Sequence, residues 1–418
     1  MSSLSGGIDF GTSNSSVGYM QQGSPSLVEF GGDGISVPSA IFYSSESTDT
    51  FFGKQAVNEY RAGIEGRLLR SLKSVLGSSL MTERTTIRNK RVLFTDIIQD
   101  FFGYLHNALG NAVDEPVTNI VVGRPVNFVD DDIERDRQAE RQLRAIAENA
   151  GFQHVEFQFE PIAAALNYES TLTQEQLAVV VDVGGGTADF TVIRLSPDRH
   201  TDTDRNPDIL STHGVHIGGT DFDRLLSLKS VMPMLGMGTA VKNTTRQLPN
   251  SVYFDLATWH RIPLLYNPST QQKIRQMLLD AEQREKVQCL LDLVISQLGY
   301  ELAGTVEQVK IQLSESHNAP FALKSLSPEL SSQISREDFE DAIDGAIAQL
   351  IEGISLSLAS AGVPTQSVTS VFYTGGSSSV PLLQRKIHDL FPLADQVRGD
   401  IFGSVGLGLT IDAARKFR

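Results

Sequence analysis

Short apolar runs that end in glycine-rich polar turns recur along this chain and predict β-hairpins. In residues 8–20 a strand is followed by a turn rich in glycine, serine and threonine, and then by a second strand. Residues 177–193 repeat this pattern much later in the chain, and the repeat aligns Asp9, Gly11 and Thr12 with Asp182, Gly184 and Thr187. The repetition predicts a duplicated α/β domain, in which each half contributes one polar hairpin to a shared cleft.

The remaining patterns predict helices that alternate with short strands. Apolar residues at helical spacing predict helices over residues 54–76, 95–109, 131–150 and 337–361, and a further helix that begins at Glu160. Apolar runs predict strands over 119–125 and 371–374, the second of which runs into a glycine turn. Residues 225–315 are expected to be mostly helical with an irregular stretch near 251–270, and residues 196–208 to form a polar loop.

Composition and charge narrow the possible partners and compartments. The chain has 418 residues, of which 40% are hydrophobic, and its formal net charge is −15. Nucleic acids and anionic membranes would repel such a chain at long range, so we expect neither as a partner. One cysteine cannot form an internal disulfide. The N-terminus lacks the features of a signal peptide, and no apolar run reaches the length of a membrane span. These features predict a cytoplasmic protein.

The glycine turns carry the chemistry of a phosphate site. A residue without Cβ allows backbone N–H groups to approach phosphate oxygens closely, and neighbouring hydroxyl groups add donors. Acidic side chains stand beside these turns, and each would repel a phosphate by about 3 kcal/mol at ~5 Å and an effective dielectric of ~20. These acidic residues are Asp9, Glu160, Asp182 and Asp189. A polyphosphate therefore needs a cation between its phosphate groups and these carboxylates. Mg²⁺ suits such a site because it binds through a few carboxylates, its own waters and phosphate oxygens.

These motifs, in their order, resemble the nucleotide-binding domain of the seventy-kilodalton heat-shock (DnaK-type) chaperones, and within that family the short, YegD-type DnaK-like proteins. The resemblance covers almost the whole chain. The matching segments are residues 8–15, 72–77, 123–126, 160–165, 182–189, 218–223, 307–314 and 375–377, together with Asp400. The resemblance implies the α/β fold of a two-lobed actin-like ATPase, built from duplicated ribonuclease-H-like domains with mixed five-stranded sheets.

The resemblance also implies the division into lobes. The first lobe would cover residues 1–172, with 395–418 returning to it. The second would cover 173–394 and include a helical nucleotide-clamping subdomain at about 220–315. ATP would lie between the lobes, which would close around ATP and relax on ADP.

The same resemblance implies the roles of individual residues. The catalytic residues would be Lys73, Glu160, Asp182, Thr187 and Asp189. Lys73 would orient the attacking water and offset γ-phosphate charge, and Asp189 would position water or help to hold a monovalent cation such as K⁺. Mg²⁺ would be held, mainly through its water molecules, by Asp9, Glu160 and Asp182. ATP or ADP would be bound by Gly11, Thr12, Ser13, Asn14, Gly184, Gly185, Gly186, Gly218, Gly219, Glu307, Lys310, Ser314, Gly375, Gly376, Ser377 and Asp400.

Three departures from the family pattern bear on function. The sequence ends at Arg418, where the family's nucleotide-binding domain finishes, so we expect no peptide-binding domain and no unaided refolding of clients. Ser379 stands where the family usually has an arginine that stacks on adenine, which predicts weaker ATP binding. Residues 232–297 are longer than their counterpart, and four aromatic side chains there form either a partner surface or a packing cluster: Phe254, Trp259, His260 and Tyr266.

The sequence thus predicts a slow Mg²⁺-dependent ATPase that acts as a conformational switch. We expect it to be a monomer that a protein partner or client reads. Three alternatives stay open at this point: a sugar or polyol kinase of the same superfamily, an actin-like filament-forming ATPase, and a nucleotide-binding scaffold with negligible hydrolysis.

Overall fold

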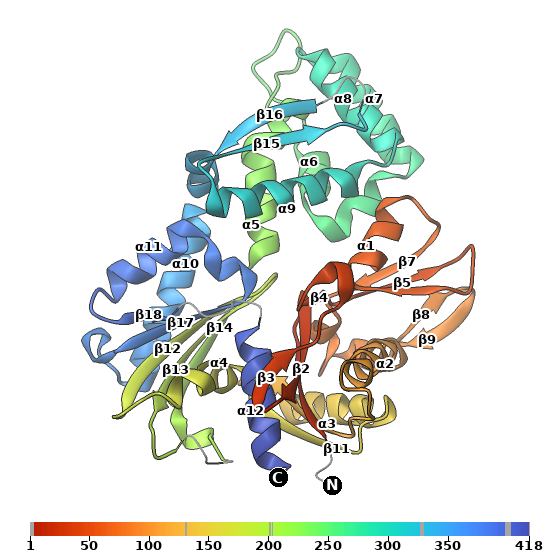
Figure 1. Ribbon diagram of the computed structural model, residues 1–418. Helices are drawn as coiled ribbons and strands as arrows, with labels where there is room; N and C mark the ends of the chain where they lie inside the picture. The colour runs from red at the N-terminus through yellow and green to blue at the C-terminus, as the bar shows by residue number, and fades with distance from the viewer. Residues whose placement is uncertain are drawn as a thin grey trace. The chain divides into compact units, whose positions relative to one another are not determined.

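The chain divides into two compact units. The computed structural model describes residues 4–129, 132–199, 202, 204–326, 330–397 and 403–417. The first unit contains Met1–His216, Ile351–Ser379 and Lys386–Arg418, and the second contains Ile217–Leu350 and Val380–Arg385. Figure 1 shows the elements of both units in sequence colours.

The first sheet of the first unit has the strand order β11-β10-β1-β2-β3, and β4 pairs with β2 beside this path. β1 is antiparallel to β2 and parallel to β10, and β10 is parallel to β11. The strands are β1 (Ser5–Phe10), β2 (Asn14–Gln21), β3 (Ser24–Leu27), β4 (Val37–Pro38), β10 (Asn119–Arg124) and β11 (His154–Phe159). The sequence predicted the hairpin and the strand near 119–125, and both are confirmed.

The second sheet repeats this arrangement with later strands. Its order is β14-β13-β12-β17-β18, with β12 antiparallel to β13, parallel to β17, and β17 parallel to β18. The strands are β12 (Gln176–Val183), β13 (Ala188–Leu195), β14 (Ile209–Val215), β17 (Ser370–Thr374) and β18 (Asp395–Val397). Each sheet therefore places two parallel crossover strands beside an antiparallel meander, which confirms the predicted duplication of an α/β domain.

Helices cover both faces of the first sheet. Side chains of α2 (Phe94–Val113) and α3 (Ile133–Asn149) pack with Ile8 and Ile120 in one apolar cluster of the first unit. On the opposite face, α4 (Glu160–Glu169) and α12 (Ser404–Lys416) pack against Val121. The backbones approach closely here, since a Cβ on Gly7 would lie 2.5 Å from the backbone nitrogen of Thr410. β18 pairs with β17 in the second sheet, and the predicted return of residues 395–418 to the first lobe stays a prediction.

The helix α4 also packs against the second sheet. Its residues Ile162 and Leu166 share a cluster with Val180 and Phe372. The other face is covered by the end of α10 (Arg336–Ala361), where a Cβ on Gly353 would lie 2.8 Å from the Phe190 ring. The short α11 (Pro381–Leu390) precedes β18. Thus α4, the helix that begins at Glu160, packs against both sheets of the first unit.

The helix predicted over 54–76 is wrong beyond its first turns. The chain forms α1 (Gly53–Arg61), then β7 (Gly66–Arg70), and then a short 3-10 helix at Leu72–Val75. Leu68 and Leu69 pair with β5 instead of lying on a helix face. Gly63, with φ +78°, ends the helix. The neighbouring small sheets consist of β5 (Ala40–Ser44), β6 (Thr50–Phe52) and β7, and of β8 (Arg84–Ile87) with β9 (Lys90–Leu93).

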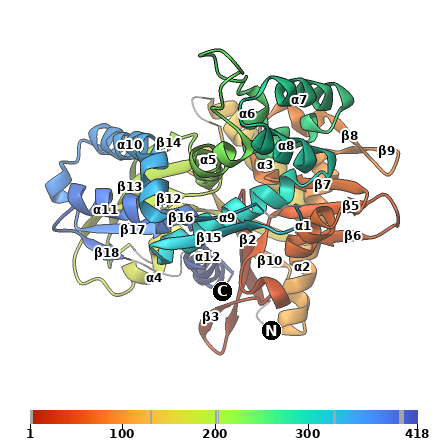
Figure 2. The ribbon, with the colours of Figure 1, turned by 90° about the horizontal axis from the view of Figure 1, so that it is seen from above.

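The second unit is mostly helical, as predicted. Its helices are α5 (Gly219–Leu226), α6 (Ser251–Ala257), α7 (Pro268–Asp280), α8 (Arg284–Ile295) and α9 (Gly299–Glu315). β15 (Asn318–Leu323) and β16 (Leu330–Ser335) form a hairpin that packs on α9, and α7 lies beside α8 (Figure 2). The irregular stretch predicted near 251–270 is wrong, because α6, a 3-10 helix (Trp259–Leu265) and the start of α7 occupy it.

Two of the four aromatic residues in this segment serve internal packing. The Trp259 ring packs edge-on against Tyr300, and the Tyr266 hydroxyl donates to the carbonyl of Gln297. Phe254 and His260 are exposed.

One helix among the described residues is long and apolar enough to cross a membrane, which the sequence analysis did not expect. This helix is α10, with a mean hydropathy of 1.3 over its most apolar window, 44% of which is buried inside the structure. A core helix of a globular protein passes the same test, and α10 packs against the second sheet through Gly353. The helices α8 and α9, taken together, are also long and apolar enough to cross a membrane, but the chain bends by 109° between them.

Candidate functional site

The first acidic hairpin joins β1 to β2 through a tight turn at residues 11–13. A Cβ on Gly11 would lie 2.2 Å from the carbonyl oxygen of Asn14, so this position requires glycine. The Ser39 hydroxyl donates to the Gly11 carbonyl at 2.7 Å and lies 2.9 Å from the Ser15 hydroxyl. These bonds fix the turn that carries Thr12 and Ser13, directly after Asp9 at the end of β1.

The second hairpin joins β12 to β13 through Gly184, Gly185, Gly186 and Thr187. The Gly184 N–H donates to the Thr187 carbonyl at 2.9 Å and closes the turn. Asp182 and Asp189 stand directly opposite each other in the strand register at its base.

The structure brings these two turns and a third one together. A Cβ on Gly185 would lie only 2.0 Å from the Ser13 hydroxyl oxygen, so the second turn touches the first. Gly375, with φ +75°, approaches the second hairpin so closely that a Cβ there would lie 2.5 Å from Asp182 Oδ1. Gly376 and Ser377 continue from it into a short 3-10 helix. The first unit therefore gathers three of the glycine turns singled out in the sequence.

Lys73 and Glu160 form an ion pair beside these turns. The Lys73 ammonium nitrogen lies 2.5 Å from Glu160 Oε1, and each side chain is 12% exposed. Lys73 comes from the short 3-10 helix and Glu160 from the start of α4, where Pro161 suits the first helical turn. A Cβ on Gly123 would lie 3.1 Å from Glu160 Cγ, so this glycine of β10 leaves room for the carboxylate.

The pKa shifts show an excess of buried negative charge. Burial, with the Glu160 carboxylate nearby, raises the pKa of Asp9 to about 7, although Lys73 opposes the shift. Burial, then Glu160 and Asp189, raise the pKa of Asp182 to about 8. Burial alone would lower the pKa of Lys73, but the carboxylates around it raise that pKa, led by Glu160. Several carboxylates thus share one ammonium group, a setting that favours an additional cation.

This donor set fits Mg²⁺ held through water. Across the described ranges, no three His, Cys, Asp or Glu side chains converge closely enough to ligate one metal ion directly. Mg²⁺ keeps several of its waters in protein sites, so Asp9, Glu160 and Asp182 would bind its hydration shell. A cavity of about 10 Å³, lined in part by Glu160, Asp182 and Asp189, offers room for about one water molecule.

The residues expected to contact the nucleoside fall into two sets. In the second unit, the Lys310 ammonium lies 2.9 Å from Asp223 Oδ1 and 3.3 Å from the Gly219 carbonyl, which places α9 against the start of α5. Gly218 caps α5, and Glu307 and Ser314 lie on α9 one turn either side of Lys310. Gly375, Gly376 and Ser377 belong to the first unit. Asp400 lies outside the described residues.

Comparison with known families settles the relationship. The family model described as "Hsp70 protein" matches residues 90–231 and 273–406, well over half of the chain. The chain belongs to the Hsp70 family. Its two mixed sheets with one repeated strand pattern are those of the two-lobed, actin-like ATPase fold of Hsp70 proteins. The match breaks at residues 232–272, within the segment that the sequence analysis found unusual.

Curated relatives of this Hsp70-family chain include two bacterial chaperones. The chain is 24% identical over 409 residues to "Chaperone protein DnaK" of Carsonella ruddii (strain PV), covering 92% of this chain and 58% of the relative. It is 25% identical over 433 residues to "Chaperone protein HscA homolog" of Shewanella denitrificans, covering 98% of this chain and 58% of the relative. The chain thus spans less than two thirds of the length of these relatives.

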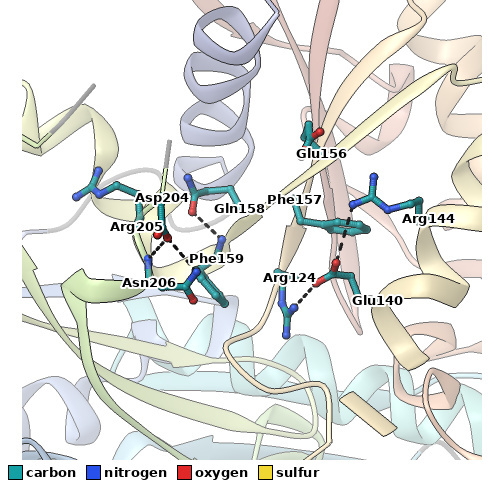
Figure 3. A pocket seen from close by; sticks show the side chains of 10 residues that line it. All are labelled: Arg124, Glu140, Arg144, Glu156, Phe157, Gln158, Phe159, Asp204, Arg205 and Asn206. Carbon is teal, nitrogen blue, oxygen red and sulfur yellow. Dashed lines mark hydrogen bonds and ion pairs between the residues drawn. The ribbon is translucent and has the colours of Figure 1, made fainter. Parts of the chain in front are cut away.

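A second, polar cavity of about 280 Å³ lies on the same unit and was not anticipated from the sequence (Figure 3). Arg124 lines it, pairs with Asp136 and Glu140, and lies 5.3 Å from the centre of the Phe159 ring. Gln158 and Phe159 line the cavity and directly precede Glu160. The strand residues that line this cavity are therefore directly connected, through the backbone, to Glu160 of the acidic site. The sequence signalled Arg124 only as part of a matching segment, because Arg124 ends β10 whereas its partners lie on the helix α3.

Proposed function

We propose that this Hsp70-family chain binds Mg-ATP at the three converging glycine turns of its first unit and hydrolyses it slowly. The observation that carries the proposal is the Lys73–Glu160 pair at 2.5 Å, placed among Asp9 and Asp182. A purely structural role does not explain why one ammonium group and several carboxylates are buried together at this place. This grouping matches the needs of a polyphosphate with its cation.

The residues would divide the work as follows. Backbone N–H groups of the turns, with the hydroxyl groups of Thr12, Ser13 and Thr187, would bind the phosphates. Bound Mg²⁺ would neutralise phosphate charge between the carboxylates and the polyphosphate. The Lys73 ammonium would offset charge on the γ-phosphate and orient the attacking water, while Asp189 would position water or help to hold a monovalent cation. Hydrolysis would thus depend on positioning and charge compensation, without a covalent intermediate.

The output would be a change of conformation between the ATP and ADP states, which a protein partner or client reads. The names of the relatives, both of them chaperone proteins, support a protein partner. The Hsp70 family match favours this function over a sugar or polyol kinase and over a filament-forming ATPase. A monomeric state, a cytoplasmic location, and the absence of nucleic-acid and membrane partners stay predictions.

The test compares Lys73→Ala with Lys386→Ala, a matched control because Lys386 is exposed. Phosphate release is measured in a single turnover with Mg²⁺, and ATP binding is measured separately by calorimetry. We expect Lys73→Ala to abolish phosphate release while ATP still binds, and Lys386→Ala to behave as the wild type. Unchanged turnover in Lys73→Ala would refute the role of this residue, and the absence of any ATP binding by the wild type would refute the proposed function.

A further inference from the structure

One region of this acidic chain is strongly basic. Residues 54–91 carry nine lysines and arginines against three glutamates, whereas the rest of the chain carries 26 against 47 acidic residues. The excess is therefore local. Six of these nine cations lie on the small sheets β6-β5-β7 and β8-β9 of the first unit or in the turn of the second, whereas Lys73 pairs with Glu160 at the nucleotide site.

Four cations in this region form what we call the basic ribbon: Arg67 of β7, and Arg84, Lys90 and Arg91 of the β8-β9 hairpin. All four side chains are exposed. Elsewhere in the structure, exposed arginines such as Arg141 and Arg261 pair with neighbouring carboxylates. Throughout the described part of the chain, no carboxylate forms an ion pair with any member of the basic ribbon.

The hairpin presents two of these cations on one face. Thr85 and Ile87 of β8 are buried, so Arg84 and Thr86 point to the opposite, outer face. Arg91 stands opposite Thr86 in the register and shares that face. The Arg84 guanidinium donates to the Arg91 carbonyl at 3.1 Å, which holds the two side by side. Like charges at neighbouring positions of a sheet repel each other, so an acidic group bound to this face would relieve the repulsion between Arg84 and Arg91.

The hairpin is held firmly in place by its turn. Arg88 and Asn89 both have positive φ, at 48° and 61°, a conformation that asparagine adopts readily but that arginine adopts only under constraint. Arg88 supplies that constraint, because its Nε donates to the Ser44 carbonyl at 2.8 Å and its guanidinium lies 5.6 Å from the centre of the Tyr43 ring. Arg67 stands opposite Tyr43 in the sheet register. The basic ribbon thus continues from the hairpin onto β7, and Figures 1 and 2 both show these elements side by side.

The backbone of the hairpin is open as well. β8 and β9 form a two-stranded sheet within the described residues, so each keeps one edge without a strand neighbour. An extended peptide can add to such an edge through main-chain hydrogen bonds, with its side chains giving specificity.

We propose that the basic ribbon docks an extended, acidic segment of a partner protein. Charge complementarity identifies the occupant: carboxylates spaced along an extended chain would meet the four unpaired cations. A nucleic-acid strand fits less well, because it cannot add to the open strand edge through the main-chain hydrogen bonds that an extended peptide makes. The proposal does not depend on ATP binding.

The test measures binding of a fluorescein-labelled oligoglutamate peptide to the full chain by fluorescence anisotropy at low salt, without nucleotide. The variant R84Q/K90Q/R91Q removes three members of the ribbon. The control R137Q/R275Q removes two exposed arginines on α3 and α7, outside the ribbon. We expect the triple variant to weaken binding about tenfold, as the loss of a few exposed charge pairs would, and the control to weaken it little.

Several outcomes would overturn the proposal. Equal binding by the wild type and the triple variant would show that the ribbon is not the docking surface. Tighter, ribbon-dependent binding of an oligothymidylate of equal charge would assign the surface to nucleic acid. If the triple variant binds peptide normally but aggregates, the cations only protect the strand edges. A second variant, Arg67→Gln, lies outside the hairpin, so it keeps the test decisive should the hairpin fail to fold in the triple variant.

Discussion

Asp182 and Asp189 stand directly opposite each other on the antiparallel strands β12 and β13, one residue pair below the glycine turn of the second hairpin. Two carboxylates in such a cross-strand pair repel each other. The pKa of Asp182 is raised to about 8, by burial first, then by Glu160 and by Asp189. The carboxylates of the site therefore repel one another at the place where the proposed Mg-ATP would bring its Mg²⁺ ion.

The metal-free protein should lose stability as the pH rises toward 8. A carboxyl group whose pKa is raised in the folded state binds a proton more tightly there than in the unfolded chain. Protonation therefore stabilises the folded state fully at pH values below the ordinary pKa of 3.8, and this stabilisation is lost as the pH rises through the pKa of the folded state. For Asp9 and Asp182 that window runs from pH 3.8 to about 7 and about 8. Asp182→Asn removes one of these charges and should flatten the profile.

Thermal and urea unfolding between pH 5 and 9 in the presence of a chelator would measure this effect. We expect Asp182→Asn to be more stable than the wild type above pH 8 by about 1–3 kcal/mol, with the difference shrinking as the pH falls. Asp389→Asn, at an exposed position, is the matched control and should follow the wild type. Parallel profiles for Asp182→Asn and the wild type would contradict the charge balance described for the site.

Gly185 and Gly186 are adjacent but should differ in their tolerance of alanine. A Cβ on Gly185 would lie 2.0 Å from the Ser13 hydroxyl oxygen, whereas a Cβ on Gly186 would meet nothing within 4 Å. Rotation of the short Ser13 side chain relieves the clash at a cost of about 0.5–1.5 kcal/mol. The rotation also turns the Ser13 hydroxyl away from its place in the turn. Gly185→Ala should therefore lower both stability and affinity for Mg-ATP.

Unfolding and calorimetric titration of the two alanine variants would separate these effects. Gly186→Ala should unfold at nearly the wild-type midpoint. The double variant Gly185→Ala/Ser13→Ala should recover the stability that Gly185→Ala loses, without recovering its affinity. If Gly185→Ala is as stable as Gly186→Ala, the two turns do not touch as the structure shows.

The glycine turns could be predicted from the sequence because they depend on local chemistry. A strand that ends in an acidic residue and a glycine-rich turn specifies a hairpin within a dozen residues, and both hairpins occur where expected. Their convergence followed from the repetition of the motif. The contacts that hold the site together could not be predicted, because each joins residues that are distant in the sequence: Ser39 to Gly11, and Gly123 to the side chain of Glu160.

The helix predicted over 54–76 failed, and the polar loop predicted over 196–208 was incomplete, each for an identifiable physical reason. Leu68 and Leu69 are compatible with a helix face and with a strand. They form a strand because their backbone pairs with β5. Residues 196–208 were predicted to be a polar loop, and their described residues do form turns and a short 3-10 helix, Asn206–Asp208. In the structure two of these charged residues, Arg205 and Asp208, are buried, because Arg205 pairs with both Asp208 and Glu169, and Arg199 also pairs with Asp208. Charge in a sequence indicates exposure only when no partner is available in the fold.

Ser379 offers a test of the departure from the Hsp70 pattern. Its hydroxyl donates to the Gly376 carbonyl at 2.7 Å and closes the short 3-10 helix after Gly375. An arginine that stacks on adenine contributes about 0.5–2 kcal/mol, so Ser379→Arg should tighten ATP binding by about 2- to 30-fold. Ser355→Arg adds the same charge at an exposed position of α10 and should leave the affinity unchanged. Calorimetric titration with ATP measures both, and equal affinities would show that position 379 does not contact the base.

The buried cluster of Arg205, Glu169 and Asp208 should make a large contribution to stability. The Arg205 guanidinium donates to both carboxylate oxygens of Glu169, at 2.8 and 2.7 Å, and to Asp208 at 2.5 Å, and all three side chains are 1% exposed. Glu169 is the last residue of α4, the helix that begins at Glu160, so the cluster anchors the far end of that helix. Arg205→Met would leave the buried Glu169 carboxylate without a cation and Asp208 with Arg199 alone, at 2.7 Å, and should cost about 3–5 kcal/mol in urea unfolding at neutral pH.

The charge and not the packing should account for most of that loss. The triple variant Arg205→Met/Glu169→Gln/Asp208→Asn removes the charges of these three side chains and should recover much of the stability, since no buried carboxylate is then left without a cation, and Arg199, which loses Asp208 as its partner, is 34% exposed. Arg141→Met, which breaks the exposed pair with Glu134, should change the free energy of unfolding by less than about 1 kcal/mol. A cost for Arg205→Met no larger than that of Arg141→Met would mean that residues 204–208 do not anchor α4, and that Glu160 keeps its position by the packing of the helix alone.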